Sequence, residues 1–502
     1  MKYKGALLIG LIASTAMSSF VNAQVYSQLW GQDGERWSPQ SRLPDFSFAG
    51  YQFGEKPLPK VEVVTNVEDF GATGDDDTDD TEAFKRAISE TNEGALFIPE
   101  GRYIISDILW IKKSNIVLRG AGIDKTVLHI TKELEDVRPN MGANTGGRVT
   151  SNYSWSGGFL WVKGAIRSKP IANVVSAHKR GAKTITVDSD PKVKVGQRVR
   201  ILLEDDADKT LLTHVYSGDS GDISKLNKAI TVEMVSRIVS IDDRQITLER
   251  PFRWDIREEW KPRLRTFEPS LSEVGIENLA ITFPAKPYQG HFTERGMNAI
   301  EIGDASDCWI RNIKIKNSDS GIYLWGRFCT IDGLLIESDR EVFRGDSGHH
   351  GVTMGYDSVL TNFDFQAKFI HDLTLGKLAS GNVFKNGKGI NLSFDHHKRA
   401  PYENLFCNID VGAGTQIWRC GGGQKLGKHC GARGTFWNIR SRQNIAPPKP
   451  KFGPDSMNFV GVQTQSPSVT NLSGQWFEVI APEALLPVDL HAAQLKRRLR
   501  QK

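Results

Sequence analysis

The histidines of this 502-residue chain are concentrated in one stretch. Of eleven histidines, five fall between positions 349 and 397: His349, His350, His371, His396 and His397. The last two stand in the segment NLSFDHHKRAP, residues 391–401, directly before Lys398 and Arg399. Imidazole exchanges protons near neutral pH, and ammonium or guanidinium groups hold anions. These residue types together predict a site that binds an acidic ligand and moves a proton.

A spacing of 21 residues relates several of these positions. It separates His350 from His371 and Cys308 from Cys329. The same step connects a second series: Tyr356, Lys377, Lys398 and Arg419. If one coil of a stacked structure holds about 21 residues, the members of each series lie over one another, about 4.8 Å apart. Three consecutive coils would then present histidines beside a cationic column.

Such a groove suits β-elimination from a uronic acid polymer. That reaction needs a cation against the carboxylate, a base for the C5 proton and an acid for the leaving oxygen. The expected roles are His397 or His371 as the base, Lys398 or Tyr356 as the acid, and Arg399 or His350 at the carboxylate. Further substrate contacts are predicted from cations and aromatic residues of these coils: Tyr323, Trp325, Arg327, Lys377, His396, Trp418 and Arg419.

The same residues allow two other interpretations. His350 and His371 share parity with Val352 and Leu373, which would turn both histidines inward as satisfied core residues. That interpretation and the catalytic one both stay open. A metal cluster could be assembled from Asp372, Asp395 and the histidines, but no spacing selects it. We therefore predict no metal site, and a calcium cofactor stays open without a recognisable binding motif.

Short apolar strands separated by turns make up the chain from residue 275 onward. Segments such as IENLAITF, CWIRNIKI and CTIDGLLI recur. Several carry an asparagine just before an apolar alternation: Asn278, Asn312, Asn362, Asn404 and Asn438. Because Gly and Asp turns join these strands instead of helices, the pattern favours stacked coils over a doubly wound sheet. Parallel strands of a β-helix are therefore expected to position the histidines.

The N-terminal part carries a resemblance to a known family. In DFGATGDDDTDDTEAFKRAI, residues 79–81 can cap a helix over about 82–90, and GALFIPEGRYII reads as strand, Pro-Gly turn and strand. These segments and NIVLRGAG at 115–122 resemble the start of the pectate-lyase superfamily. The resemblance covers about residues 63–122. It implies an all-β, right-handed parallel β-helix with an N-terminal capping helix, in proteins that are mostly secreted and act on polysaccharides.

The resemblance leaves the reaction open. SGHHGVTMG resembles the Gly-His-Gly strand of polygalacturonase-type hydrolases, with His350 and Gly351 at the matching place. The paired aspartates of those enzymes are incomplete here because Asp319 is followed by a serine, although Asp346 and Asp395 could supply carboxyl groups. We rank a lyase for acidic polysaccharides first and a hydrolase second. A non-catalytic, glycan-binding β-helix comes third.

Six segments are expected along the chain. In residues 1–23, Lys2 and Lys4 precede an apolar run that ends in Val-Asn-Ala, which is typical of a cleaved signal and predicts a secreted or periplasmic protein. An aromatic, Pro-rich arm (24–60) precedes the first coils (61–169). Alternating apolar and polar residues predict a small inserted antiparallel β module at 170–255. The main coils (256–480) and a helix covering their open end (481–502) follow.

Charge and cysteine content narrow the partners. The formal charge of +5 falls to +3 when the signal, with its two lysines, is removed. The sequence has no basic arm of the kind that binds nucleic acid, and we predict neither a nucleic-acid partner nor insertion into a membrane. The predicted partner is an acidic polysaccharide, and the oligomeric state stays open. Five cysteines leave at least one unpaired. Cys308 with Cys329, and Cys420 with Cys430, could form disulfides or stay thiols, as could Cys407.

Overall fold

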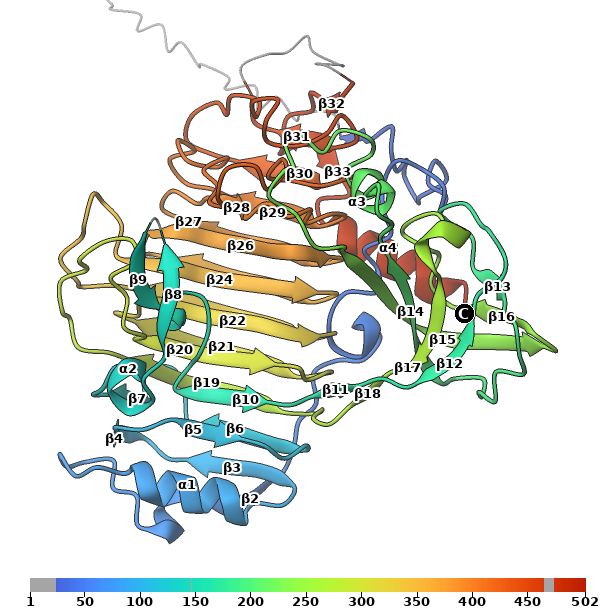
Figure 1. Cartoon of the computed structure of the whole chain (residues 1–502). Coiled ribbons are helices and arrows are strands. Elements are labelled where there is room, and N and C mark those ends of the chain that lie inside the picture. Colours follow the sequence, from blue (N-terminus) through green and yellow to red (C-terminus); the bar gives the residue numbers. More distant parts are fainter. Residues whose placement is uncertain (1–23, 146, 465–473) are drawn as a thin grey trace, which may run out of the picture.

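The chain folds into a right-handed parallel β-helix, as predicted (Figure 1). The computed structural model describes residues 24–145, 147–464 and 474–502. The predicted secretion signal, residues 1–23, lies outside these described residues. Among the helices that are described, none has the length and apolar character needed to cross a membrane.

Two long parallel sheets run along the stack. The back sheet comprises β2 (Val63–Asn66), β3 (Gly94–Ile98), β4 (Gly101–Ile105), β6 (Ile116–Gly120), β7 (Thr126–Ile130), β19 (Gly275–Thr282), β21 (Trp309–Lys316), β23 (Thr330–Glu337), β25 (Val359–Phe365), β27 (Val383–Gly389), β29 (Leu405–Asp410), β30 (Thr435–Arg440), β31 (Asn458–Val462) and β32 (Trp476–Glu478). The front sheet comprises β5 (Leu109–Ile111), β10 (Leu160–Lys163), β20 (Asn298–Gly303), β22 (Ser320–Arg327), β24 (Gly348–Tyr356), β26 (Phe369–Ser380) and β28 (Phe394–His396). Buried apolar side chains of both sheets share one core.

A column of asparagines bends the strands of the back sheet. The residues at this corner have positive φ and are skipped in the strand pairing. All are asparagines except for one glycine: Asn278, Asn312, Gly333, Asn362, Asn386, Asn408 and Asn438. Asparagine adopts this left-handed conformation more readily than most residues do. Two pairs of these side chains bond across neighbouring coils, where Asn312 Nδ2 donates to Asn278 Oδ1 at 3.0 Å and Asn408 Nδ2 donates to Asn386 Oδ1 at 2.8 Å. Each coil therefore repeats the same bend.

One of the asparagines singled out in the sequence lies elsewhere. Asn404 is buried in the turn before β29, where its Nδ2 donates to the Ala379 carbonyl at 2.8 Å. Asn408 occupies the corner position of that coil. The sequence pattern is ambiguous there because two asparagines stand four residues apart.

The predicted antiparallel module is present beside the front sheet (Figure 1). Its strands are β12 (Pro170–Asn173), β13 (Thr184–Thr186), β14 (Arg198–Glu204), β15 (Thr231–Asp242), β16 (Gln245–Leu248) and β17 (Arg263–Thr266), with α3 (Thr210–Val215) between them. The pairing thus extends past residue 255, the predicted limit, to β17. The module's core includes Leu378, Ala400 and Tyr402 from the coils, so the two parts pack directly against one another.

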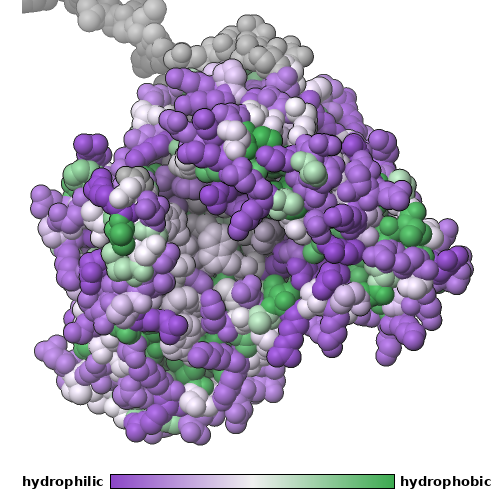
Figure 2. All heavy atoms as spheres, viewed as in Figure 1, coloured by the Kyte–Doolittle hydropathy of each residue, from purple (hydrophilic) through white to green (hydrophobic). Residues whose placement is uncertain are grey.

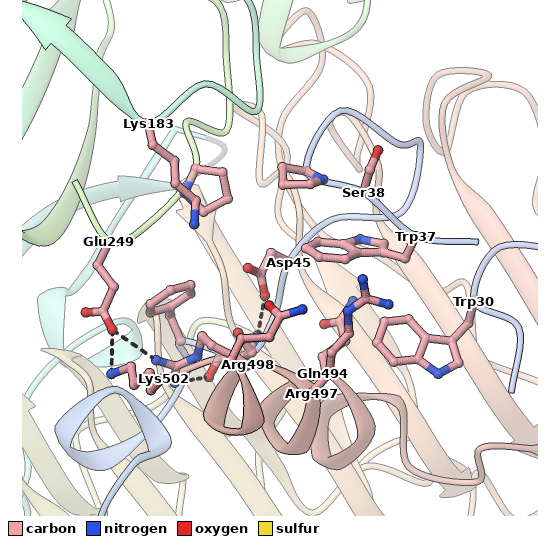
Figure 3. Close-up of a pocket in the computed structure, with 15 residues that line it drawn as sticks. Trp30, Trp37, Ser38, Asp45, Lys183, Glu249, Gln494, Arg497, Arg498 and Lys502 are labelled. Atoms are coloured by element: carbon pink, nitrogen blue, oxygen red, sulfur yellow. Dashed lines mark hydrogen bonds and ion pairs between the residues drawn. The ribbon is translucent and has the colours of Figure 1, made fainter. Parts of the chain in front are cut away.

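The N-terminal arm and the C-terminal helix cover the outer side of the back sheet. Leu490 of α4 (Leu490–Arg500) shares a buried cluster with Trp30 of the arm and Val383 of β27. A pocket of about 360 Å³ remains between arm, helix and module, where Trp37 and Lys502 lie (Figure 3). The C-terminal helix is confirmed, but it packs beside the coils instead of over their open end, because this flank offers apolar side chains to its buried face.

The smaller elements complete the chain. They are β1 (Val25–Tyr26), η1 (Tyr51–Gly54), η2 (Val67–Phe70), α1 (Thr81–Glu90), α2 (Leu134–Val137), β8 (Met141–Thr145), β9 (Arg148–Ser151), η3 (Asn152–Ser154), β11 (Ile166–Arg167), η4 (Glu258–Trp260), β18 (Glu268–Pro269) and β33 (Leu485–Leu486). The helix expected at 82–90 is α1, which buries Phe84 and Ile88 against the first coils. Its role as a cap stays a prediction. All five cysteines are free thiols.

Candidate active site

A cavity of about 760 Å³ opens over strands β22, β24 and β26 of the front sheet. Figure 2 shows the molecular face hollowed at this place. One wall comes from the β8–β9 hairpin, which stands in front of the sheet (Figure 1). The main lining side chains are Asn144, Asn152, Trp155, His291, Phe292, Tyr323, Trp325, His350, Thr353, Thr374, Lys377, His397 and Arg399.

His350 faces this cavity, and His371 stacks beside it. The two residues pair across β24 and β26, as the 21-residue spacing predicts, with ring centroids 4.9 Å apart. The inward orientation inferred from parity is wrong, because the inward position belongs to Gly351. A Cβ there would stand 2.5 Å from the Phe365 ring of the core. The Nδ1 atom of His350 instead lies 3.1 Å from Thr374 Oγ1 on the cavity side.

A histidine and a buried aspartate form a pair at the cavity. His397 Nδ1 lies 2.9 Å from Asp395 Oδ2, and the Gly421 backbone N–H donates to Asp395 Oδ1 at 2.7 Å. Burial opposes charge on both groups, but the nearby imidazoles keep the pKa of Asp395 well below its ordinary value. In return, the carboxylate of Asp395 raises the pKa of His397 against the effect of burial. This hydrogen bond leaves the Nε2 atom of His397 available for proton transfer.

The turn after His397 has an unusual backbone. Lys398, Arg399 and Ala400 all have positive φ, at 61°, 61° and 57°. Such consecutive non-glycine residues cost about 1–2 kcal/mol each and concentrate at functional sites. The module supports the turn, because the Ala400 N–H donates to the Tyr216 hydroxyl at 2.8 Å. Burial, and next the charge of Lys451, lower the pKa of Lys398.

Three histidines meet at the side of the cavity next to this pair. His291 Nε2 lies 2.9 Å from His349 Nε2, and the His349 and His371 rings are 5.4 Å apart. Burial lowers the pKa of His291 and of His371 to about 4, and burial also raises the pKa of Glu294 behind them to about 7. Within the part of the chain that the structure describes, two groups have ligand atoms close enough to hold one metal ion: His291, His349 and His371, or His371, Asp395 and His397.

Not every predicted residue reaches the cavity. Tyr356 lies under the guanidinium of Arg327, 4.1 Å from its ring centroid, and that guanidinium pairs with Glu233 of the module. The predicted alignment of Tyr356 with Lys377 is wrong. The register between β24 and β26 shifts after Met354, so Tyr356 pairs with Ser380 instead. The predicted proton donor and its neighbouring cation therefore belong to the junction with the module.

His396 and Trp418 face the core. His396 points to the opposite side of its strand from His397, with its Nδ1 3.0 Å from the Phe394 carbonyl oxygen. Trp418 packs 4.9 Å from Phe436, centroid to centroid, so it offers no stacking platform to the cavity. The predicted substrate contacts of His396 and Trp418 therefore disagree with the positions of these side chains in the core.

Arg419 and Lys398 border the cavity without lining it. The guanidinium of Arg419 pairs with Asp346 at 3.1 Å. The aliphatic stem of Lys398 packs beside Gly422, which lines the cavity. Four other predicted contacts do line it: Tyr323, Trp325, Lys377 and Arg399.

No carboxylate lines the cavity among the described residues. Asp319 is paired with Arg340 at 2.9 Å, and Asp346 with Lys368 at 2.8 Å, so both are neutralised away from it. The cavity consequently combines imidazoles, an ammonium and a guanidinium with aromatic and amide side chains. Electrostatically, it suits an anionic ligand.

Several lining residues were missed in the sequence. His291, Phe292 and Trp155 come from irregular segments that carry no repeat or motif. The only signal was a lone histidine in a Gly- and Pro-containing loop, which by itself indicates nothing. Asp395 was considered as a metal ligand, but not as the partner of His397.

Part of the chain matches a known family. Residues 64–201 match the model described as "Rhamnogalacturonase A/epimerase, pectate lyase-like", which confirms the resemblance to the pectate-lyase superfamily. "Alginate lyase 7" of Azotobacter vinelandii is 34% identical over 100 residues, 18% of this chain and 12% of that protein. "Mannuronan C5-epimerase AlgE5" of the same organism is 33% identical over 100 residues, 18% of this chain and 10% of that protein. The chain therefore spans only about a tenth of these relatives.

Two solved structures align with most of this chain at low identity. The tailspike gp61 of Pseudomonas phage phi297 has a TM-score of 0.48 and 12% identity, covering 80% of this chain and 68% of the tailspike. The A-module of the Azotobacter vinelandii epimerase AlgE4 has a TM-score of 0.28 and 13% identity, covering 75% of this chain and 98% of the module.

Proposed function

We propose that this protein is an exported polysaccharide lyase that cleaves a uronate-containing polymer by β-elimination. One observation carries the proposal: the cavity presents a histidine backed by a buried aspartate, next to cations and without a lining carboxylate among the described residues. The names of the relatives, an alginate lyase and epimerases of mannuronan, point to the same class of substrate.

The proposed reaction assigns one task to each group. The Nε2 of His397 removes the C5 proton, while Asp395 holds the opposite ring nitrogen and stabilises the imidazolium that forms. Arg399 and Lys377 neutralise the carboxylate, which makes the C5 proton more acidic. The C4–O bond breaks as the C4–C5 double bond forms. Lys398, whose stem borders the cavity beside Gly422, turns its ammonium group toward the substrate and gives its proton to the leaving oxygen. Its lowered pKa favours that transfer.

Aromatic residues would hold the sugar rings beside these groups. Tyr323 and Trp325 are stacked with their rings 11° apart, and both line the cavity. Trp155 and Phe292 stand on the wall, 5.6 Å apart. Sugar rings pack on such surfaces through their C–H faces, which positions a chain without adding charge.

The structure supports hydrolysis less well. A glycosidase of the common type needs two carboxyl groups that flank the scissile bond. The candidates Asp319, Asp346 and Asp395 are each engaged with a cation or imidazole, and none lines the cavity.

C5 epimerisation is the second candidate. The relatives named as mannuronan C5-epimerases favour it. It begins with the same proton abstraction, but the carbanion is then protonated from the opposite face and the C4–O bond stays intact. The wall that stands in front of the sheet carries Asn144 and Asn152. Neither amide is an ordinary proton donor, and this favours elimination.

A panel of acidic and neutral polysaccharides tests the proposal. Purified protein is incubated with alginate, pectate, glucuronan and a neutral glucan, while ultraviolet absorbance and reducing ends are followed together. Elimination predicts that both rise on a uronate polymer. Reducing ends without absorbance would replace the proposal by hydrolysis, and deuterium uptake at C5 without new ends would replace it by epimerisation. Binding without any reaction would leave a non-catalytic role.

A further inference from the structure

Three histidines converge from separate parts of the chain at one side of the cavity. His291 lies in the irregular segment between β19 and β20, His349 in β24 and His371 in β26. Their ligand atoms lie within 4.8 Å of one another. His291 lines the cavity, whereas the other two are buried behind it.

The spacing of two of these nitrogens suits one shared ion. His291 Nε2 and His349 Nε2 are 2.9 Å apart. Nitrogens that each bind zinc at about 2.0–2.1 Å stand about 3.3 Å apart in tetrahedral geometry. A shift of a few tenths of an ångström would therefore admit the ion.

Buried ring nitrogens here have no hydrogen-bond partner among the described residues. Both nitrogens of His371 and the Nδ1 of His349 are in this state, although the two side chains are at most 4% exposed. An unsatisfied buried polar atom costs about 1–3 kcal/mol, so its presence calls for an explanation. A bound ion would give the Nε2 atom of His371 a partner, whereas the two Nδ1 atoms face carboxylates.

A carboxylate stands behind each of the two buried histidines. Glu294 Oε1 lies 3.7 Å from His349 Nδ1, and Asp395 Oδ2 lies 3.3 Å from His371 Nδ1. Histidines that bind metal ions commonly direct their second ring nitrogen to a carboxylate, which orients the ring and makes the ligand more basic. In this arrangement the Nε2 atoms of both rings are the metal-binding ones.

We propose that His291, His349 and His371 bind one divalent transition-metal ion of the zinc class, with an open position toward the cavity. Imidazole ligands favour zinc and its neighbours over calcium or magnesium, which prefer oxygen ligands. The site is thus distinct from a carboxylate-based calcium site. Next to the reacting groups, the ion would add positive charge for the substrate's carboxylate, and this role alone rests on the proposed function.

Zinc and cobalt binding to the full, chelator-treated protein test the site without any polysaccharide. Calorimetry with ZnCl₂ should show one ion per chain, and CoCl₂ should give visible absorption bands of a nitrogen-bound ion. His291→Ala, which changes a residue in a loop, should lower zinc affinity about 100-fold or more and abolish the bands. Glu294→Gln should lower the affinity about 10–100-fold, which a purely structural role would not do.

His429→Ala is the matched control, since His429 lies outside the trio and contacts the His396 carbonyl oxygen. It should bind zinc like the unchanged protein. Absence of stoichiometric zinc binding would overturn the site. So would binding that survives His291→Ala but is lost in His397→Ala, which would place the ion at His371, Asp395 and His397. An inactive protein that still binds zinc would overturn the proposed function alone.

Discussion

The front and back sheets are made by the same coils but differ in regularity. In the back sheet, residues pair in register from β19 to β31, and two pairs of corner asparagines bond across neighbouring coils. In the front sheet, register shifts after Leu324 and Met354, and histidines carry unpartnered nitrogens. The regular sheet contributes stability, whereas the irregular one presents titratable side chains at the cavity.

Two buried carboxylates show the difference at single residues. Glu277 of the back sheet accepts from Arg119 Nε at 2.8 Å and also pairs with Arg311, so both of its cationic partners are guanidinium groups. Asp395 of the front sheet contacts the imidazoles of His371 and His397, whose charge depends on a mobile proton. Arginine stays charged and suits a structural ion pair, whereas histidine can gain or lose a proton and suits proton transfer.

Removal of the front-sheet base should have the largest effect. We expect His397→Ala to lower turnover about 10²–10⁴-fold, because general base catalysis is lost. The protein should stay folded, since this side chain is 28% exposed and Asp395 keeps the Gly421 N–H and the His371 ring as neighbours. Initial rates by ultraviolet absorbance and a melting curve measure both. His178→Ala, in the module, is the control, and unimpaired turnover of His397→Ala would remove it from the mechanism.

Neutralising the buried carboxylate of the back sheet should lower stability without changing turnover. Glu277→Gln leaves two arginines without their counter-charge and should lower the free energy of unfolding by about 3 kcal/mol. The value stays at the lower end for buried pairs because Arg119 and Arg311 are 19% and 26% exposed. Chemical denaturation measures it. Loss of turnover per folded molecule would contradict the separation of the two sheets.

The asparagine corner should show a smaller effect of the same kind. Asn312→Ala places alanine, which adopts the left-handed conformation less readily than asparagine, at a φ of 52° and removes the bond to Asn278. The two effects together should cost about 2 kcal/mol. Asn312→Gly keeps the backbone conformation, as Gly333 does one coil later, and should cost about half as much. Equal losses in the two variants would show that the conformation contributes nothing.

Loss of a cation at the edge of the cavity should have the smallest effect, and this effect should be on substrate binding. Arg399→Ala should raise KM about tenfold, or about 1.4 kcal/mol, with a smaller change in kcat, because the exposed guanidinium holds the substrate's carboxylate. Lys388→Ala removes an exposed cation of the back sheet and should leave KM unchanged. A similar rise in KM for both would mean that the overall charge, and not the cavity, governs binding.

The sequence predicted the parts of the fold that repeat. Short apolar strands, asparagine corners and the entry motif indicate a β-helix because each coil must meet the same stacking condition. The 21-residue spacing held from His350 to His371, where both strands pair without interruption. It failed at Tyr356, because a local register shift leaves no trace in residue spacing.

The sequence predicted part of the lining of the candidate cavity. His397 and Arg399 were found because they stand in one conspicuous turn, and His350 because its coil repeats. Residues from irregular insertions, such as His291 and Trp155, could not be placed, since only tertiary packing brings them to the front sheet. The alternation of side chains along β24 predicted that His350 could point inward. It points to the cavity instead, because Gly351 occupies the inward position of its strand.

The walls of the cavity come from segments that leave the coils and return to them. The β8–β9 hairpin and the irregular residues between β19 and β20 stand over a floor made by the stack, and the module supports the turn after His397 (Figure 1). The stacking period does not fix the length of such insertions. Evolution or an engineer can therefore exchange a wall to suit a different polymer while the reacting floor is inherited unchanged, so specificity and chemistry can diverge independently.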